Sequence, residues 1–132
     1  MASKLLDAMF QEGSYAIGTV NSWKARVLAN GAKVDETVIE NFTFVEVYYN
    51  VEGERCCKYL TSATKNAYLI DGVERRLEDE PLNNFYNAKD ELARLWILER
   101  GFRFESSKIS KNAGVTDIKK GMVAHWDSTA KT

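Results

Sequence analysis

The chain has 132 residues and a mass of 15.0 kDa, and 45% of its residues are hydrophobic, 28% are charged and one is a proline. This composition excludes a disordered or collagen-like chain and predicts a single folded domain over residues 1–132. Eighteen basic and nineteen acidic residues give a formal net charge of −1, which lacks the basic excess typical of a dedicated nucleic-acid binder.

The N-terminal residues 1–12 are predicted to form a short amphipathic helix or arm, ahead of a β-rich core over residues 13–132. Ser3 is a candidate N-cap, and Gly13 ends the pattern. The apolar stripe at helical spacing consists of Leu5, Leu6, Met9 and Phe10. This stripe has two interpretations, which are packing on its own core and docking on another subunit. No apolar run approaches the roughly 20 residues that span a bilayer, so we expect no membrane partner.

Short alternating segments dominate the next part of the chain and predict strands. They cover residues 15–20, 23–29, 43–51, 55–61 and 66–70, and the acidic stretch 35–40 is predicted as a loop. The clearest pair is 43–51 with 55–61, since period-2 alternation on both sides of Glu52-Gly53-Glu54 predicts a β-hairpin.

The segment 83–98 is ambiguous, because its helix formers precede an apolar run that also fits a buried strand. We favour a hairpin of residues 92–98 with 102–106, followed by a last short strand over 121–126. The sum is a mainly β fold, predicted as a small barrel or sandwich of short antiparallel strands with one or two short helices.

Residues with catalytic or metal-binding potential are sparse. Cys56 and Cys57 are adjacent, a spacing that suits neither a disulfide framework nor a thiolate metal site, so we expect two free thiols in a reducing compartment. His125 is the single histidine, and no nucleophile motif or phosphate-binding glycine loop accompanies it. We therefore predict a protein that is not an enzyme, with no catalytic residue, metal or cofactor.

Charge is unevenly distributed along the chain. Residues 35–54 carry six acidic and no basic side chains, whereas residues 100–132 carry seven basic and three acidic ones. If these segments lie on different faces, complementary patches would let copies of the chain meet head to tail. The alternative is that both segments are ordinary solvated loops.

The C-terminal third combines basic and aromatic side chains. A candidate surface for single-stranded nucleic acid consists of Phe102, Arg103, Phe104, Lys119, Lys120 and Trp126. The alternative, which we favour, is that the aromatic rings fill a small β core while the lysines solvate loops.

Four short motifs resemble small structural proteins of tailed bacteriophages. They are NNFYN at 83–87, ARL at 93–95, GFRFES at 101–106 and IKKGMVAHWD at 118–127. The chain resembles capsid decoration, cement or head-fibre proteins. This resemblance implies a β-rich, non-enzymatic module, made in the bacterial host cytoplasm and present in many copies on the capsid surface of the virion. Its implied partners are the major capsid protein lattice, copies of itself, or both.

Overall fold

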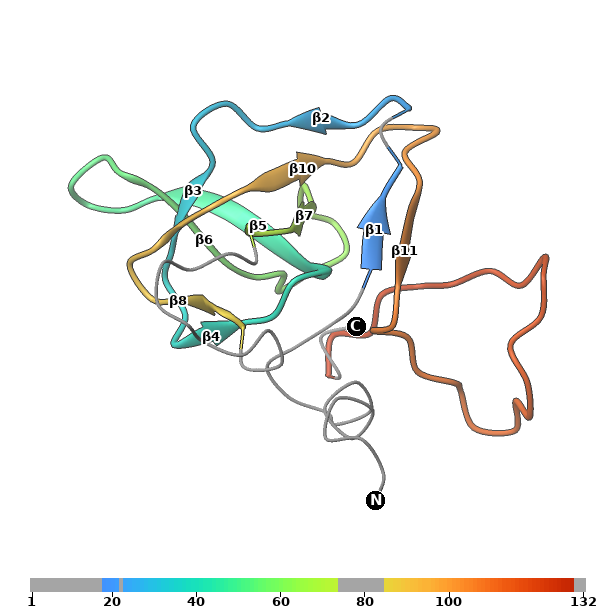
Figure 1. Cartoon of the computed structure of the whole chain (residues 1–132). Coiled ribbons are helices and arrows are strands. Elements are labelled where there is room, and N and C mark those ends of the chain that lie inside the picture. Colours follow the sequence, from blue (N-terminus) through green and yellow to red (C-terminus); the bar gives the residue numbers. More distant parts are fainter. Residues whose placement is uncertain (1–17, 22, 74–84, 130–132) are drawn as a thin grey trace, which may run out of the picture.

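A computed structural model describes residues 18–21, 23–73 and 85–129 of the chain, which form eleven short strands in three sheets (Figure 1). The strands are β1 (Gly18–Val20), β2 (Arg26–Val27), β3 (Ala32–Val34), β4 (Val38–Ile39), β5 (Thr43–Tyr49), β6 (Arg55–Tyr59), β7 (Tyr68–Ile70), β8 (Asn87–Ala88), β9 (Leu92–Ala93), β10 (Leu95–Ile97) and β11 (Phe104–Ser106). The prediction of a mainly β protein is confirmed.

Three parts of the fold prediction are corrected or untested. No helix occurs in the described ranges, so the predicted short helices are absent from them, and none of these residues forms a helix that could span a membrane. The predicted helical arm at residues 1–12 lies outside the described residues. The sheets do not close into a barrel: the seven-stranded sheet runs β2-β10-β7-β5-β6-β3-β9, and its end strands β2 and β9 contain only two residues each.

The β5–β6 hairpin is the centre of the large sheet and confirms the prediction. Val45 pairs with Tyr59 at one end of the ladder and Tyr49 with Arg55 at the other. The turn is closed by Asn50, whose Oδ1 accepts hydrogen bonds from the backbone N–H groups of Glu52 and Glu54, at 3.0 and 2.9 Å. The hairpin therefore follows from local turn chemistry together with alternation.

The predicted hairpin of residues 92–98 with 102–106 is wrong. Strand β10 pairs antiparallel with β2 on one edge and with β7 on the other, whereas β11 pairs with β1 in a separate two-stranded sheet. Both edges of β10 are occupied, so β11 has no position beside it. The ambiguity is resolved in favour of strands for the described residues 85–98, which contain β8, β9 and β10.

Two further local predictions are wrong. The stretch 35–40, predicted as a loop, contains β4, which pairs with β8. Residues 121–126, predicted as a strand, form none, because this segment has no neighbouring strand edge and Val123 is 90% exposed.

A long bent ribbon covers the core. The segment 26–34 pairs with the segment 91–97 at both ends, through β2 with β10 and through β3 with β9. At the bend, Gly31 has a φ of +54°, and a Cβ there would lie 2.2 Å from the carbonyl oxygen of Ala93, so glycine is required. The main core is formed by residues of this ribbon together with residues of β5, β6 and β7; its fully buried members include Val34, Leu95, Val45, Cys57 and Ile70.

Candidate functional site

A buried asparagine pair fixes the turn at residues 71–73. The side chain of Asn41 binds both backbone groups of Gly72, accepting from its N–H at 2.8 Å and donating to its carbonyl oxygen at 3.1 Å. Asn87 Nδ2 donates to Asn41 Oδ1 and to the carbonyl oxygen of Ile39, both at 2.9 Å. Because both asparagines are under 5% exposed, this network holds the turn and strand β8 rigidly together.

A second polar cluster lies beside this turn. Arg94 donates from Nε to the carbonyl oxygen of Asp71 and from Nη2 to its Oδ2, both at 2.8 Å. Trp96 Nε1 also donates to Asp71 Oδ2, at 2.9 Å, and the Arg94 guanidinium lies 5.2 Å from the centre of the Trp96 ring. The positive charge of Arg94 is therefore neutralised, and its side chain is held in one position.

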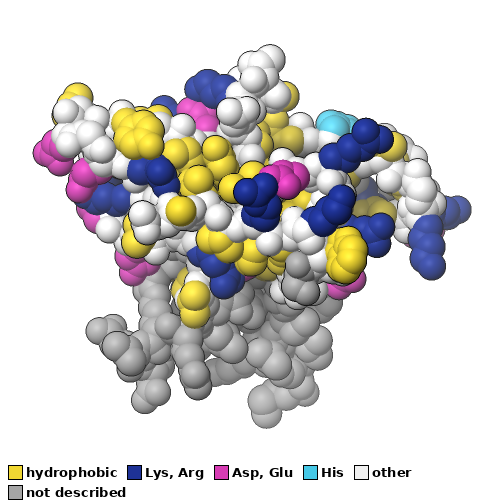
Figure 2. Space-filling view, turned by 90° about the horizontal axis from the view of Figure 1, so that it is seen from above, with side chains coloured by type: hydrophobic (Ala, Val, Ile, Leu, Met, Phe, Trp, Pro, Cys, Tyr) yellow, Lys and Arg dark blue, Asp and Glu magenta, His cyan; other side chains and the backbone are white. Residues whose placement is uncertain are grey.

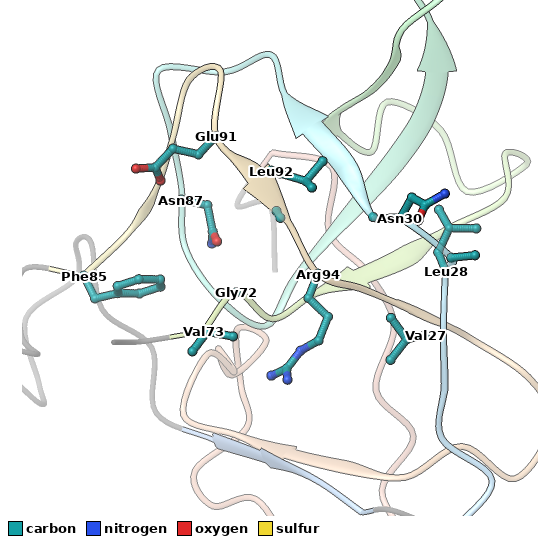
Figure 3. Close-up of a pocket in the computed structure, with 13 residues that line it drawn as sticks. Val27, Leu28, Asn30, Gly72, Val73, Phe85, Asn87, Glu91, Leu92 and Arg94 are labelled. Carbon is teal, nitrogen blue, oxygen red and sulfur yellow. The ribbon is translucent and has the colours of Figure 1, made fainter. Parts of the chain in front are cut away.

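These two clusters support one wall of a cleft of about 620 Å³ (Figure 3). Phe85 and Val73 stand on one side, Val27 and Leu28 on the other, and Leu92 lies between them. Val27, Val73 and Leu92 are 45%, 65% and 74% exposed. Single exposed apolar side chains are common, but several gathered in one concave region are typical of a binding surface.

A second hollow of about 410 Å³ adjoins the cleft and shares Asn30, Gly31 and Leu92 with it. Among its charged residues, Lys33 Nζ lies 3.1 Å from Glu54 Oε2 and 3.4 Å from Asp90 Oδ1, and Arg55 Nη1 donates to the carbonyl oxygen of Ala29 at 2.6 Å. Its apolar contribution is the ring of Tyr49, which is 65% exposed. We call the cleft and this hollow together the Leu92 face.

The sequence did not predict the Leu92 face. Leu92 was predicted as the first residue of a strand over 92–98, with no role in a surface, and the structure buries Ala93 and Leu95 but leaves Leu92 exposed. The alternation of β9 does indicate that Leu92 and Ala93 point to opposite sides. The alternation does not indicate which of the two sides is covered, and in the structure the side of Leu92 is the exposed one.

The predicted basic and aromatic surface is only partly assembled. Phe102 and Phe104 lie together, with ring centres 6.0 Å apart, and they pack against Trp96 and Phe44 at 6.4 and 6.2 Å. Arg103 is exposed beside them. The rings thus pack on one another, and Phe104 is still 36% exposed, so they do not form the filled core of the favoured interpretation.

The remaining predicted surface residues belong to the segment 107–129, which contains no strand and extends away from the β body (Figure 1). Lys119 and Lys120 are exposed, whereas Trp126 is half-buried. Lys and Arg side chains gather on the side of the molecule where this segment lies (Figure 2). The segment also exposes apolar side chains; Ile109, Ile118, Met122 and Val123 are 58%, 57%, 53% and 90% exposed.

The acidic and basic segments are joined within one molecule by an ion pair in the described part of the chain. Lys108 Nζ lies 2.6 Å from Glu40 Oε2, with both side chains largely buried. Glu46 binds Lys58 and Lys65. Some of the acidic side chains in residues 35–54 therefore form ion pairs within the molecule. Only the charged side chains that remain exposed could contribute to the head-to-tail contact between copies.

Reactive groups are few in the described part of the chain. Cys56 and Cys57 are free and buried, and burial raises the pKa of Cys57 to about 12, which keeps the thiol protonated. No group of three His, Cys, Asp or Glu side chains in the described ranges could hold a metal ion. The candidate docking arm of Leu5, Leu6, Met9 and Phe10 lies outside the described residues.

Comparisons with known proteins give one family. The family described as "YonC prophage protein" matches residues 11–132. The SPbeta prophage-derived uncharacterized protein YonC from Bacillus subtilis (strain 168) is 43% identical over 128 residues, which cover 96% of this chain and 72% of that protein. No solved structure matches the chain.

Proposed function

Because this chain belongs to the YonC prophage protein family, we propose that it is a non-enzymatic structural protein of a phage particle, which acts by binding other virion proteins. The observation that carries this proposal is the Leu92 face, where Val27, Val73 and Leu92 expose apolar surface above a rigid polar frame. Protein surfaces of this kind are typical of protein–protein contacts.

The proposed partners are the major capsid protein lattice and copies of the chain itself. A protein that binds only assembled subunits stabilises the assembly by mass action, because dissociation of the lattice then requires loss of the bound protein. The role is thus reinforcement of the particle after synthesis in the host cytoplasm. The β fold, the family and the resemblance of the four short motifs support this proposal.

The experiment uses particles released from a lysogen that carries the gene, purified on a density gradient and examined by quantitative mass spectrometry. We expect the wild-type chain in multiple copies per particle and at least a tenfold loss for Leu92→Asp. Val51→Asp is the matched control, because Val51 is likewise an exposed apolar side chain but lies outside the Leu92 face. Absence of the wild-type chain from particles, or equal incorporation of all three forms, would overturn the proposal.

The alternative function predicted from the sequence is binding of single-stranded nucleic acid. Arg103, Lys119 and Lys120 are exposed, but Phe102 and Phe104 pack on other rings, which leaves less of their faces for stacking of bases. We therefore take a protein as the partner. A steeply salt-dependent affinity of the purified chain for a labelled oligonucleotide, together with absence from particles, would reverse this choice.

A further inference from the structure

Two turns of the chain lie side by side at one end of the β body (Figure 1). One leads from β1 to β2 and the other from β10 to β11. The Asn21 N–H in the first turn donates to the carbonyl oxygen of Arg103 in the second, at 3.0 Å. A Cβ at Gly101 would lie 3.4 Å from Lys24 Cδ, so the Lys24 side chain lies across the second turn. We call the described residues of the two turns, 21, 23–26 and 99–103, the Trp23 surface.

Trp23 is the most exposed aromatic side chain of this surface, with 73% of its area open to solvent. Its position in the turn is fixed locally, because its N–H donates to Asn21 Oδ1 at 2.9 Å and the next residue, Lys24, has a φ of 59° in the left-handed region. In the described part of the chain the indole ring has no ring contact or cation–π partner. The ring is therefore available to stack on a planar group.

The charge of the Trp23 surface is positive, in contrast to the net charge of −1 of the whole chain. Its one carboxylate, Glu99, accepts a hydrogen bond from Arg26 Nη1 at 2.9 Å. Glu105, the next carboxylate along β11, does not reverse the excess of positive charge. Three further cations are exposed and form no ion pair within the described ranges; they are Lys24, Arg100 and Arg103.

We propose that the Trp23 surface binds single-stranded nucleic acid, with a base stacked on Trp23 and neighbouring phosphates bound by Lys24, Arg100 and Arg103. A single strand offers both groups that this surface fits, since its bases expose flat faces and its phosphates accept paired hydrogen bonds from guanidinium groups. A duplex keeps its base faces inside the stack, and an acidic peptide supplies carboxylates without bases.

This surface differs from the nucleic-acid surface predicted from the sequence, with which it shares Phe102 and Arg103. The rings of Phe102 and Phe104 pack on other rings, whereas the open ring here is that of Trp23. None of its residues lines the Leu92 face. The inference thus adds a second binding activity to the proposed contact with virion proteins, and each is tested without the other.

The test is the affinity of the purified full chain for a labelled thymidine oligonucleotide, measured by fluorescence anisotropy from low to high salt. With three phosphate contacts, the logarithm of the binding constant should fall with the logarithm of salt concentration at a slope of about −2. Trp23→Ala should weaken binding by about tenfold, and Trp23→Phe by less, because phenylalanine retains a ring. The oligonucleotide should quench tryptophan fluorescence in the wild type and much less in Trp23→Ala.

Charge variants locate the phosphate contacts. Arg100→Gln and Arg103→Gln should each weaken binding and make the salt slope shallower by about 0.7. Lys111→Gln is the matched control, because it removes one exposed positive charge outside the Trp23 surface and should leave the slope unchanged. The substituted side chains are all exposed, and circular dichroism checks that each variant is folded.

Four results would overturn the inference. They are failure of the wild type to bind the oligonucleotide at low salt, equal binding by Trp23→Ala, equal affinity for a duplex of the same length, and equal competition by polyglutamate. Loss of binding in Lys119→Gln and Lys120→Gln, with none in the two arginine variants, would place the contact on the C-terminal segment and would also overturn it.

Discussion

Glu46 provides the sharpest test of the energetics of this fold. Its carboxylate on β5 is 6% exposed, and it accepts hydrogen bonds from Lys65 Nζ at 2.8 Å, Thr61 Oγ1 at 2.7 Å and the Thr61 N–H at 3.1 Å. Burial by itself would raise the pKa of Glu46, but the bonds from Lys65 and Thr61 outweigh it and lower the pKa from 4.5 to about 2.

The size of the effect follows from this shift. A change from 4.5 to about 2 corresponds to about 3 kcal/mol of preference for the charged form in the folded state. Lys58 and Lys65 are 38% and 49% exposed, so solvent screening reduces the expected contribution to about 1–2 kcal/mol. Because the folded-state pKa lies below the unfolded value, this stability is present above pH 4.5 and is lost as the pH falls towards 2.

The assay is urea unfolding followed by tryptophan fluorescence at pH 7 and at pH 3, on the wild type, on Glu46→Gln and on Glu52→Gln. Glu52 is the matched control, because it is an exposed carboxylate in the β5–β6 turn. At pH 7 we expect Glu46→Gln to be less stable than the wild type by about 1–2 kcal/mol and Glu52→Gln to be unchanged. At pH 3 the deficit should shrink. A deficit of equal size at both pH values would refute the role of the charged form.

Three further predictions concern the frame, the thiols and the arm. Gly72→Ala should lower the melting temperature by several degrees, since its Cβ would lie 2.1 Å from Asn87 Oδ1; an unchanged melting curve contradicts the rigid network. At pH 8 a disulfide reagent should label Cys56 and Cys57 slowly in the native protein and quickly in urea, whereas rapid native labelling would show that they are accessible. Deleting residues 1–10 should leave the β domain folded but abolish incorporation into particles, and normal incorporation would exclude the docking arm.

The sequence predicts features that depend on neighbouring residues. The β5–β6 hairpin has an alternating pattern on both sides of its turn, so its register follows from local chemistry. The partner strands of β10 cannot be predicted from local chemistry, because pairing depends on which strand edges remain open after the rest of the sheet has formed. Gly101 between two apolar runs is compatible with a tight hairpin of residues 92–98 with 102–106. This hairpin is excluded only because β2 and β7 already occupy both edges of β10.

The candidate site is less predictable for the same reason. Asn41 and Asn87 are residues typical of turns, and their buried pairing depends on a contact between positions 46 apart in the chain. Leu92 alternates with the buried Ala93 on β9 and so points away from the core, but the sequence does not show whether another segment covers that side. By contrast, Lys119 and Lys120 are exposed, as expected of lysine side chains, which are rarely buried without a partner.

The bent ribbon also determines when during synthesis the protein can acquire its native structure. Residues 26–34 emerge early from the ribosome, but their partner strands β9 and β10 emerge only about sixty to seventy residues later. Ala93 and Leu95 are core residues, so a nascent chain that ends before residue 97 exposes the apolar side of β5 and β7. The ribbon thus makes folding late and collective, and a host chaperone that shields this surface would act during that interval.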